Sequence, residues 1–106
     1  MNILFVCSRN QWRSPTAETV FRRQPGIQVR SGGTSPRARH TVSAKDIAWA
    51  DIIMVMESKH KNRLQAAFPA ALTHKKMVVL DIADDYRYMD ADLVVLLQQS
   101  VAPYLP

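Results

Sequence analysis

The residues of this sequence best suited to do chemistry are a cysteine and an arginine near the amino terminus. Cys7 is the sole cysteine of the chain, and Arg13 follows it after five intervening residues. The apolar run 3–6 before Cys7 predicts a strand, and Ser14-Pro15 after Arg13 predicts the start of a helix. A loop between a strand and a helix N-terminus turns backbone N–H groups inward and binds tetrahedral oxyanions such as phosphate.

Cys7 and Arg13 would have complementary roles in such a loop. A guanidinium can hold two phosphate oxygens at once, and both arginines and helix N-termini favour the thiolate form of a cysteine. A thiolate that faces a phosphorus atom is a nucleophile. Taken alone, a cysteine after a strand is more often a buried, small apolar residue. The surrounding residues must therefore decide between the two interpretations.

Those surrounding residues form a specific pattern. Val6-Cys7, Asn10, Arg13-Ser14-Pro15 and Ala17-Glu18 resemble the active-site signature Cys-x-x-Asn-x-x-Arg-Ser-Pro-x-Ala-Glu of the low-molecular-weight protein tyrosine phosphatases. Further segments match the family in the same order along the chain, namely Ser31-Gly32-Gly33-Thr34, the strand-like 50–56 and Asp81-Ile82-Ala83-Asp84-Asp85-Tyr86. The resemblance covers nearly the whole chain. It implies a phosphomonoesterase that works through a phosphocysteine intermediate and needs no cofactor and no metal.

The resemblance also implies a role for each matched residue. Cys7 attacks phosphorus, Arg13 and the loop amides from Ser8 onward hold the phosphate oxygens, and Ser14 donates a hydrogen bond to the Cys7 sulfur. Asp84 is the general acid and later the general base, although Asp85 stands where the family has proline and either carboxylate can serve. The predicted substrate-binding residues are Ser8, Arg9, Asn10, Gln11, Trp12 and Tyr86.

Asn10 has a second implied role in shaping the loop. In the family this asparagine takes a left-handed conformation, which asparagine tolerates better than most residues that carry a Cβ. Ser31 matches a serine that helps to fix it. We therefore expect Ser31 to support the loop from behind.

Apolar runs alternate with helical patterns along the chain, which is typical of a parallel sheet joined by crossover helices. We expect strands near 2–6, 27–31, 51–56 and 76–81, and helices from Ser14 to near Pro25-Gly26, over 43–49, from Ser58 to Phe68 and over 90–101. The fold class is thus α/β, a single doubly wound domain over residues 1–106. Its four-stranded parallel sheet has helices on both faces and the phosphate loop after the first strand. Cys7 and Asp84 both follow strand ends, where open sheets of this kind bind ligands.

Composition excludes several other classes of protein. The chain has 106 residues, of which 47% are hydrophobic, but no run approaches the ~20 apolar residues of a membrane helix, and no signal segment opens the sequence. One cysteine excludes an internal disulfide, so we expect a cytoplasmic protein. His40, His60 and His74 are scattered and have no cysteine partners, which argues against a metal site, and we expect all three on the surface.

The sequence departs from the family pattern at the mouth of the predicted pocket. Arg9 replaces a small residue, Gln11 an apolar one, and Trp12 a position that is often a second cysteine. The segment 34–43 is short, and in the family this region supplies a histidine to the asparagine network. His40 is either a substitute for that histidine or a surface residue. Selectivity for phosphotyrosine therefore cannot simply be inherited.

Charge leaves the substrate open. Residues 1–45 carry seven arginines and one lysine against a single acid, Glu18, although the whole chain has a net charge of only +5. This basic half is either a solvated face or a binding surface for a polyanion such as a nucleotide, an RNA end or an ADP-ribose-type phosphate. The expected partner is thus a phosphorylated substrate, either a phosphotyrosine protein or one of these anions, with nucleic acid only as substrate and no membrane.

Two other functions compete with a phosphatase. An arsenate reductase on the same scaffold needs further cysteines to resolve its intermediate, which this chain lacks. A non-catalytic phosphate-binding module is favoured if Asp84 and Asp85 both face away from the site.

Overall fold

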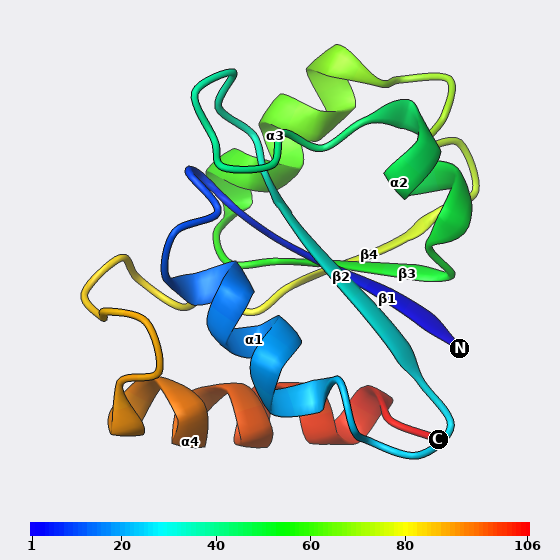
Figure 1. Cartoon of the computed structure of the whole chain (residues 1–106). Coiled ribbons are helices and arrows are strands. Elements are labelled where there is room, and N and C mark those ends of the chain that lie inside the picture. Colours follow the sequence, from blue (N-terminus) through cyan, green and yellow to red (C-terminus); the bar gives the residue numbers. More distant parts are fainter.

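Strands and helices alternate along the computed structural model, which describes all 106 residues (Figure 1). The strands are β1 (Asn2–Cys7), β2 (Gln28–Gly33), β3 (Ile52–Val55) and β4 (Lys76–Val79). The helices are α1 (Arg13–Phe21), α2 (Ala44–Trp49), α3 (Ser58–Ala67) and α4 (Ala91–Val101), followed by a 3₁₀ turn at Ala102–Tyr104. The predicted order of elements is confirmed.

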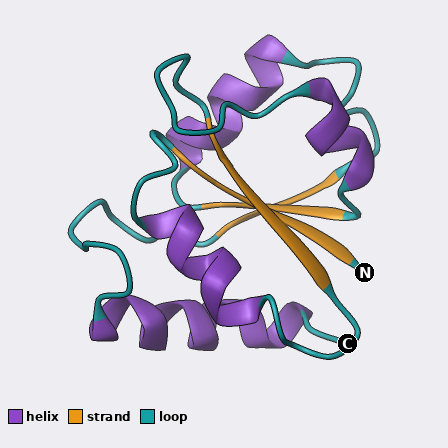
Figure 2. Cartoon of the chain, viewed as in Figure 1, coloured by secondary structure: helices purple, strands orange, loops and turns teal.

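The four strands form one parallel sheet in the order β2-β1-β3-β4 (Figure 2). β1 lies inside the sheet, with Phe5 opposite Ser31 of β2 and opposite Met54 of β3. Because all strands run the same way, the carboxyl ends of β1, β2 and β3 meet at one edge. Cys7 ends β1 at that edge, beside Gly33 of β2.

Helices cover both faces of the sheet, as the sequence predicted. α1 and α4 lie on one face, and α2 and α3 on the other (Figure 1). Side chains of β1 alternate between the two layers, so that Ile3 and Phe5 pack with α1 and α4, whereas Leu4 and Val6 pack on the opposite side. A strand buried on both faces gives Cys7 a rigid base. No helix is both long and apolar enough to cross a membrane.

Three boundaries differ from the prediction by two residues or more, and one of them is the end of β4, which lies at Val79 and not near residue 81. α1 ends at Phe21 and not near Pro25, and the chain leaves the helix through a turn in which the Gln24 N–H donates to the Phe21 carbonyl oxygen at 2.9 Å. Gly26 then turns the chain with a positive φ of 83°. β2 continues to Gly33, where a Cβ atom would lie 2.5 Å from the Ser8 carbonyl oxygen. Glycine at this position therefore lets the end of β2 come close to the loop that follows Cys7.

Candidate active site

The loop after β1 presents its backbone N–H groups to the space around Cys7. The carbonyl oxygens of residues 7–10 accept hydrogen bonds from the segment 34–39 at 3.0 to 3.2 Å. Across a trans peptide, the C=O of one residue and the N–H of the next point in opposite directions. The N–H groups of residues 8–11 therefore point away from segment 34–39, and none from Ser8 to Ser14 has a protein acceptor. This arrangement is an oxyanion-binding nest.

A buried chain of hydrogen bonds lies behind the nest. The Ser31 hydroxyl donates to the Glu18 carboxylate at 2.8 Å, and the Asn10 amide donates to the hydroxyl oxygens of Ser31 and Ser14, each at 2.9 Å. The Ser14 oxygen accepts from Asn10, so its single proton can be donated either to the Cys7 sulfur, 3.0 Å away, or to the Gly32 carbonyl oxygen, 3.3 Å away. The order of donors thus allows the Ser14 hydroxyl to stabilise a thiolate.

The Asn10 side chain supports the loop through these hydrogen bonds and lies outside the pocket. The φ of Asn10 is 54°, the left-handed conformation that the resemblance implied, and its side chain is buried. The side chain points behind the loop, so the predicted contact of Asn10 with substrate can be made only by its backbone N–H, which belongs to the nest. Ser14 does not cap the helix, because its hydroxyl contacts Cys7, Asn10 and the Gly32 carbonyl oxygen.

Arg13 is buried at the start of α1 and is held in one orientation. Its Nη1 donates to the Glu57 carboxylate and to the Ile82 carbonyl oxygen, both at 2.8 Å, and its Nε lies 3.5 Å from the Asp84 carboxylate. The hydrogen bond from Arg13 holds the pKa of Glu57 below its usual value despite partial burial. The Nη2 side of the guanidinium has no protein partner, which leaves an edge for phosphate oxygens.

His60 also belongs to the site, and its predicted surface position is wrong. The ring is fully buried, and burial together with the nearby charge of Arg13 lowers its pKa to about 4. Its Nδ1 accepts the Glu57 backbone N–H at 3.0 Å, so the neutral ring carries its proton on Nε2 and donates it to the Ser8 hydroxyl at 2.8 Å. His60 thereby connects Ser8 of the phosphate loop to the start of α3.

The sequence analysis did not assign Glu57 or His60 to the site, although the sequence contains a signal for each. His60 stands four residues before Leu64, and on a helix this spacing places them on the same face, which is buried. Glu57 follows β3 at the sheet edge where β1 delivers Cys7. Together, these two patterns predict that both side chains lie near the loop that follows Cys7.

The other two histidines lie on the surface as expected. His74 is exposed, and the His40 side chain is half exposed with its Nε2 2.8 Å from the buried carboxylate of Asp46. Burial alone would raise the pKa of Asp46, but hydrogen bonds from Ser43 and His40 outweigh it and hold that pKa below its usual value. His40 makes no bond to Asn10 and so does not replace the histidine of the family network.

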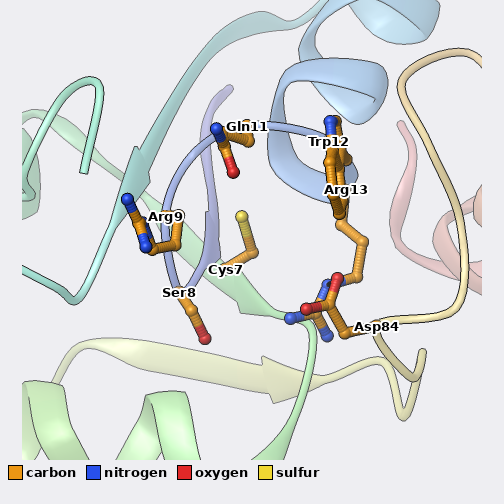
Figure 3. Close-up of a pocket in the computed structure, with 7 residues that line it drawn as sticks. All are labelled: Cys7, Ser8, Arg9, Gln11, Trp12, Arg13 and Asp84. Atoms are coloured by element: carbon orange, nitrogen blue, oxygen red, sulfur yellow. Dashed lines mark ion pairs between the residues drawn. The ribbon is translucent and has the colours of Figure 1, made fainter. Parts of the chain in front are cut away.

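Figure 3 shows the pocket that these elements enclose. It has a volume of about 40 Å³, and its lining residues are Cys7, Ser8, Arg9, Gln11, Trp12, Arg13 and Asp84. Asp84 faces Arg13 across the opening with its side chain 54% exposed, whereas Asp85 does not line the pocket. Tyr86 is partly buried, packs against the core cluster and does not line the pocket, and its contact with substrate stays a prediction.

Known proteins share this sequence pattern and this fold. A curated relative, the probable low molecular weight protein-tyrosine-phosphatase EpsP of Ralstonia nicotianae, is 27% identical over 135 aligned positions that cover 98% of this chain and 93% of the relative. An alignment longer than the 106 residues of this chain contains gaps, which agrees with the predicted shortening. No protein-family model matches the chain.

Solved structures are similar over nearly their whole length. The tyrosine phosphatase Wzb of Escherichia coli K30, in complex with phosphate, has a TM-score of 0.78 at 22% identity, over 97% of this chain and 94% of that one. The YwlE arginine phosphatase of Geobacillus stearothermophilus has a TM-score of 0.71 at 23% identity, over 95% and 86%. The predicted resemblance is therefore confirmed: the chain has the fold and the phosphate-loop signature of the low-molecular-weight protein tyrosine phosphatases.

Proposed function

We propose that this protein is a cysteine-dependent phosphomonoesterase of the protein-tyrosine-phosphatase type. The observation that carries the proposal is the run of backbone N–H groups from Ser8 to Ser14, none of which has a protein acceptor, around the Cys7 sulfur. Three equatorial oxygens of a transferring phosphoryl group need such donors, and positioning together with electrostatic stabilisation is most of what a protein contributes to this reaction.

The first chemical step forms a phosphocysteine. The Cys7 thiolate attacks phosphorus, the S–P bond forms, and the bond from phosphorus to the leaving oxygen breaks. Asp84 in its protonated form gives its proton to that oxygen. The loop amides and the free edge of Arg13 hold the phosphoryl oxygens throughout.

The second step returns the enzyme to its starting state. The Asp84 carboxylate takes a proton from water as the water oxygen attacks phosphorus, and the S–P bond breaks to release inorganic phosphate. The Ser14 hydroxyl, 3.0 Å from the sulfur, stabilises the departing thiolate. A thiol that must stay reduced fits a cytoplasmic protein.

The residues that line the pocket, together with the single cysteine, also bear on the two competing functions, a silent phosphate-binding module and an arsenate reductase. Asp84 lines it while Asp85 does not, which supports Asp84 as the acid and argues against a silent phosphate-binding module. With a single cysteine, an arsenate reductase lacks a resolving thiol. The relatives named above include tyrosine phosphatases and an arginine phosphatase, so a phosphotyrosine protein is one candidate substrate, and the basic amino-terminal half makes a small polyanionic phosphate the other.

The test is replacement of the nucleophile and capture of the intermediate. We expect Cys7→Ser to reduce hydrolysis of an aryl phosphate to background while phosphate binding persists, because the nest and Arg13 remain. Acid quenching of the wild-type protein during turnover should leave phosphate on Cys7, detected by mass spectrometry of the peptide. Sustained hydrolysis by pure Cys7→Ser protein in a chelator would overturn the covalent mechanism.

A further inference from the structure

A second hollow opens beside the catalytic pocket. It has a volume of about 560 Å³ and shares Gln11 and Trp12 with the pocket. We call it the α1 groove, and its remaining lining residues are Pro15, Glu18, Thr19, Arg22, Arg39 and Tyr88. The catalytic pocket, at about 40 Å³, has room for little more than one phosphate group. The rest of a substrate must therefore lie outside it, across the rim that leads into this groove.

The α1 groove carries a net positive charge, with two arginines, Arg22 and Arg39, against one acid, Glu18. Neither Arg22 nor Arg39 is within 4.0 Å of an acidic oxygen, and the same holds for Arg9 at the rim. Arg39 uses its Nε to donate to the Asn10 carbonyl oxygen at 3.2 Å, and its terminal nitrogens have no protein partner. The one acid of the groove, Glu18, already accepts from Ser31.

Arg39 and Arg22 lie at different distances from the pocket. Arg39 bonds directly to the phosphate loop, whereas Arg22 stands nine residues after Arg13, or about 13 Å along the axis of α1. A second anion that is a few bonds from the reacting phosphate would thus meet Arg39 first, and Arg22 would bind groups further along.

Aromatic side chains border the same groove. The Trp12 side chain lines both pocket and groove, is 37% exposed, and has the Arg87 guanidinium 5.8 Å from its ring centre. Tyr88 is 50% exposed, and its hydroxyl lies 2.8 Å from the Thr19 hydroxyl. Exposed, oriented rings of this kind stack on planar ligands such as nucleobases.

We propose that the α1 groove is a substrate subsite for nucleoside bisphosphates, with one phosphate in the Cys7 pocket and the second at Arg39, while Arg22 adds positive charge further along the groove. The base lies against Trp12. Besides Trp12, the rim of the pocket presents the polar side chains of Arg9 and Gln11, which suit a charged nucleotide better than the apolar ring of a phosphotyrosine. The assignment rests on the proposed phosphatase activity and specifies its substrate class.

The test compares substrates that differ by one phosphate. We expect kcat/KM for a nucleoside 3′,5′-bisphosphate to exceed that for the matching nucleoside 5′-monophosphate about tenfold, as one charge-assisted contact provides. Arg39→Gln should lower this ratio severalfold, and Arg22→Gln should lower it less. Arg23→Gln, which removes the same charge from an exposed turn outside the groove, should leave the ratio unchanged. Raising the salt concentration from about 50 to 200 mM should also lower it.

A binding experiment separates failure of the subsite from failure of the phosphatase. The Cys7→Ser protein, titrated calorimetrically with both nucleotides, should bind the bisphosphate more tightly whether or not the wild type turns it over. Equal affinities, or a phosphotyrosine peptide hydrolysed well ahead of both nucleotides, would overturn the subsite and leave the phosphatase standing. Tighter bisphosphate binding without hydrolysis of any ester would support the subsite and overturn the phosphatase.

Discussion

The two sides of the phosphate loop differ in how tightly their side chains are held. Behind the loop, Asn10, Ser14 and Ser31 are buried and are joined to one another and to Glu18 by hydrogen bonds. At the mouth, the side chains of Arg9, Gln11 and Trp12 are exposed and make no hydrogen bond. Figure 3 shows these mouth side chains directed around the opening above Cys7.

This difference separates the reaction from the choice of substrate. The buried side matches the family pattern, because changing one member would leave another buried polar group unpaired at a cost of about 1–3 kcal/mol. The mouth departs from the pattern, since substitutions at exposed positions usually change stability by less than about 0.5 kcal/mol. One fold can therefore keep its chemistry while the rim is altered for another leaving group.

Asp84 is the strongest challenge to this comparison, because it is exposed at the mouth and yet proposed to take part in chemistry. We expect Asp84→Asn to slow esters with poor leaving groups by about a hundred- to ten-thousandfold, the usual range for general acid assistance. Activated aryl esters should slow far less, because their leaving oxygen needs no proton. The measurement is a plot of log kcat against leaving-group pKa for wild type and variant.

Asp85→Asn is the matched control for Asp84→Asn. Asp85 does not line the pocket, so its replacement should leave the plot nearly unchanged. A steep leaving-group dependence in Asp85→Asn together with a silent Asp84→Asn would show that the wrong carboxylate has been assigned.

The pH dependence of stability tests whether His60 is buried and neutral behind the phosphate loop. The pKa of His60 is about 4 in the folded protein against 6.5 in the unfolded chain, so the unfolded state binds more protons between these values. Stability therefore falls as pH decreases through this window, by about 2 kcal/mol between pH 7 and pH 5. The lowered pKa values of Glu57 and Asp46 cause losses only at more acidic pH. Urea unfolding at the two pH values measures the difference.

Two variants isolate the contribution of His60. His60→Gln is neutral throughout, so its stability should change much less between pH 7 and pH 5, whatever its absolute value. His74→Asn removes an exposed histidine and keeps a residue that tolerates the positive φ of 65° at that position. It should retain the wild-type pH dependence. Identical pH dependence in wild type and His60→Gln would contradict a buried, neutral His60.

The sequence was sufficient for the fold and for the part of the site that lies within one segment. Apolar runs and helical spacing located β1 and β3 to within a residue at each end, and the same holds for α3 and α4. Cys7, Arg13 and Ser14 share one short loop, so their spacing alone brings them together. Glu57 and His60 follow another strand end. The polar residues around them, Lys59, Lys61 and Arg63, concealed the burial of His60. Only strand order places Glu57 and His60 beside Arg13.

Arg9 offers the smallest and most selective effect, because it lines the mouth without a hydrogen bond or ion pair. Arg9→Ala should lower kcat/KM for a multiply charged nucleotide about threefold to tenfold, as expected for an exposed charge contact of roughly 1 kcal/mol. A singly phosphorylated aryl ester should change less, since the loop amides and Arg13 still hold the transferred group. Arg37→Ala, an exposed arginine outside both hollows, is the matched control. An equal loss for both substrates in Arg9→Ala would mean that Arg9 supports the loop itself. Arg9 would then belong with the residues that hold the loop and not with the exposed residues of the mouth.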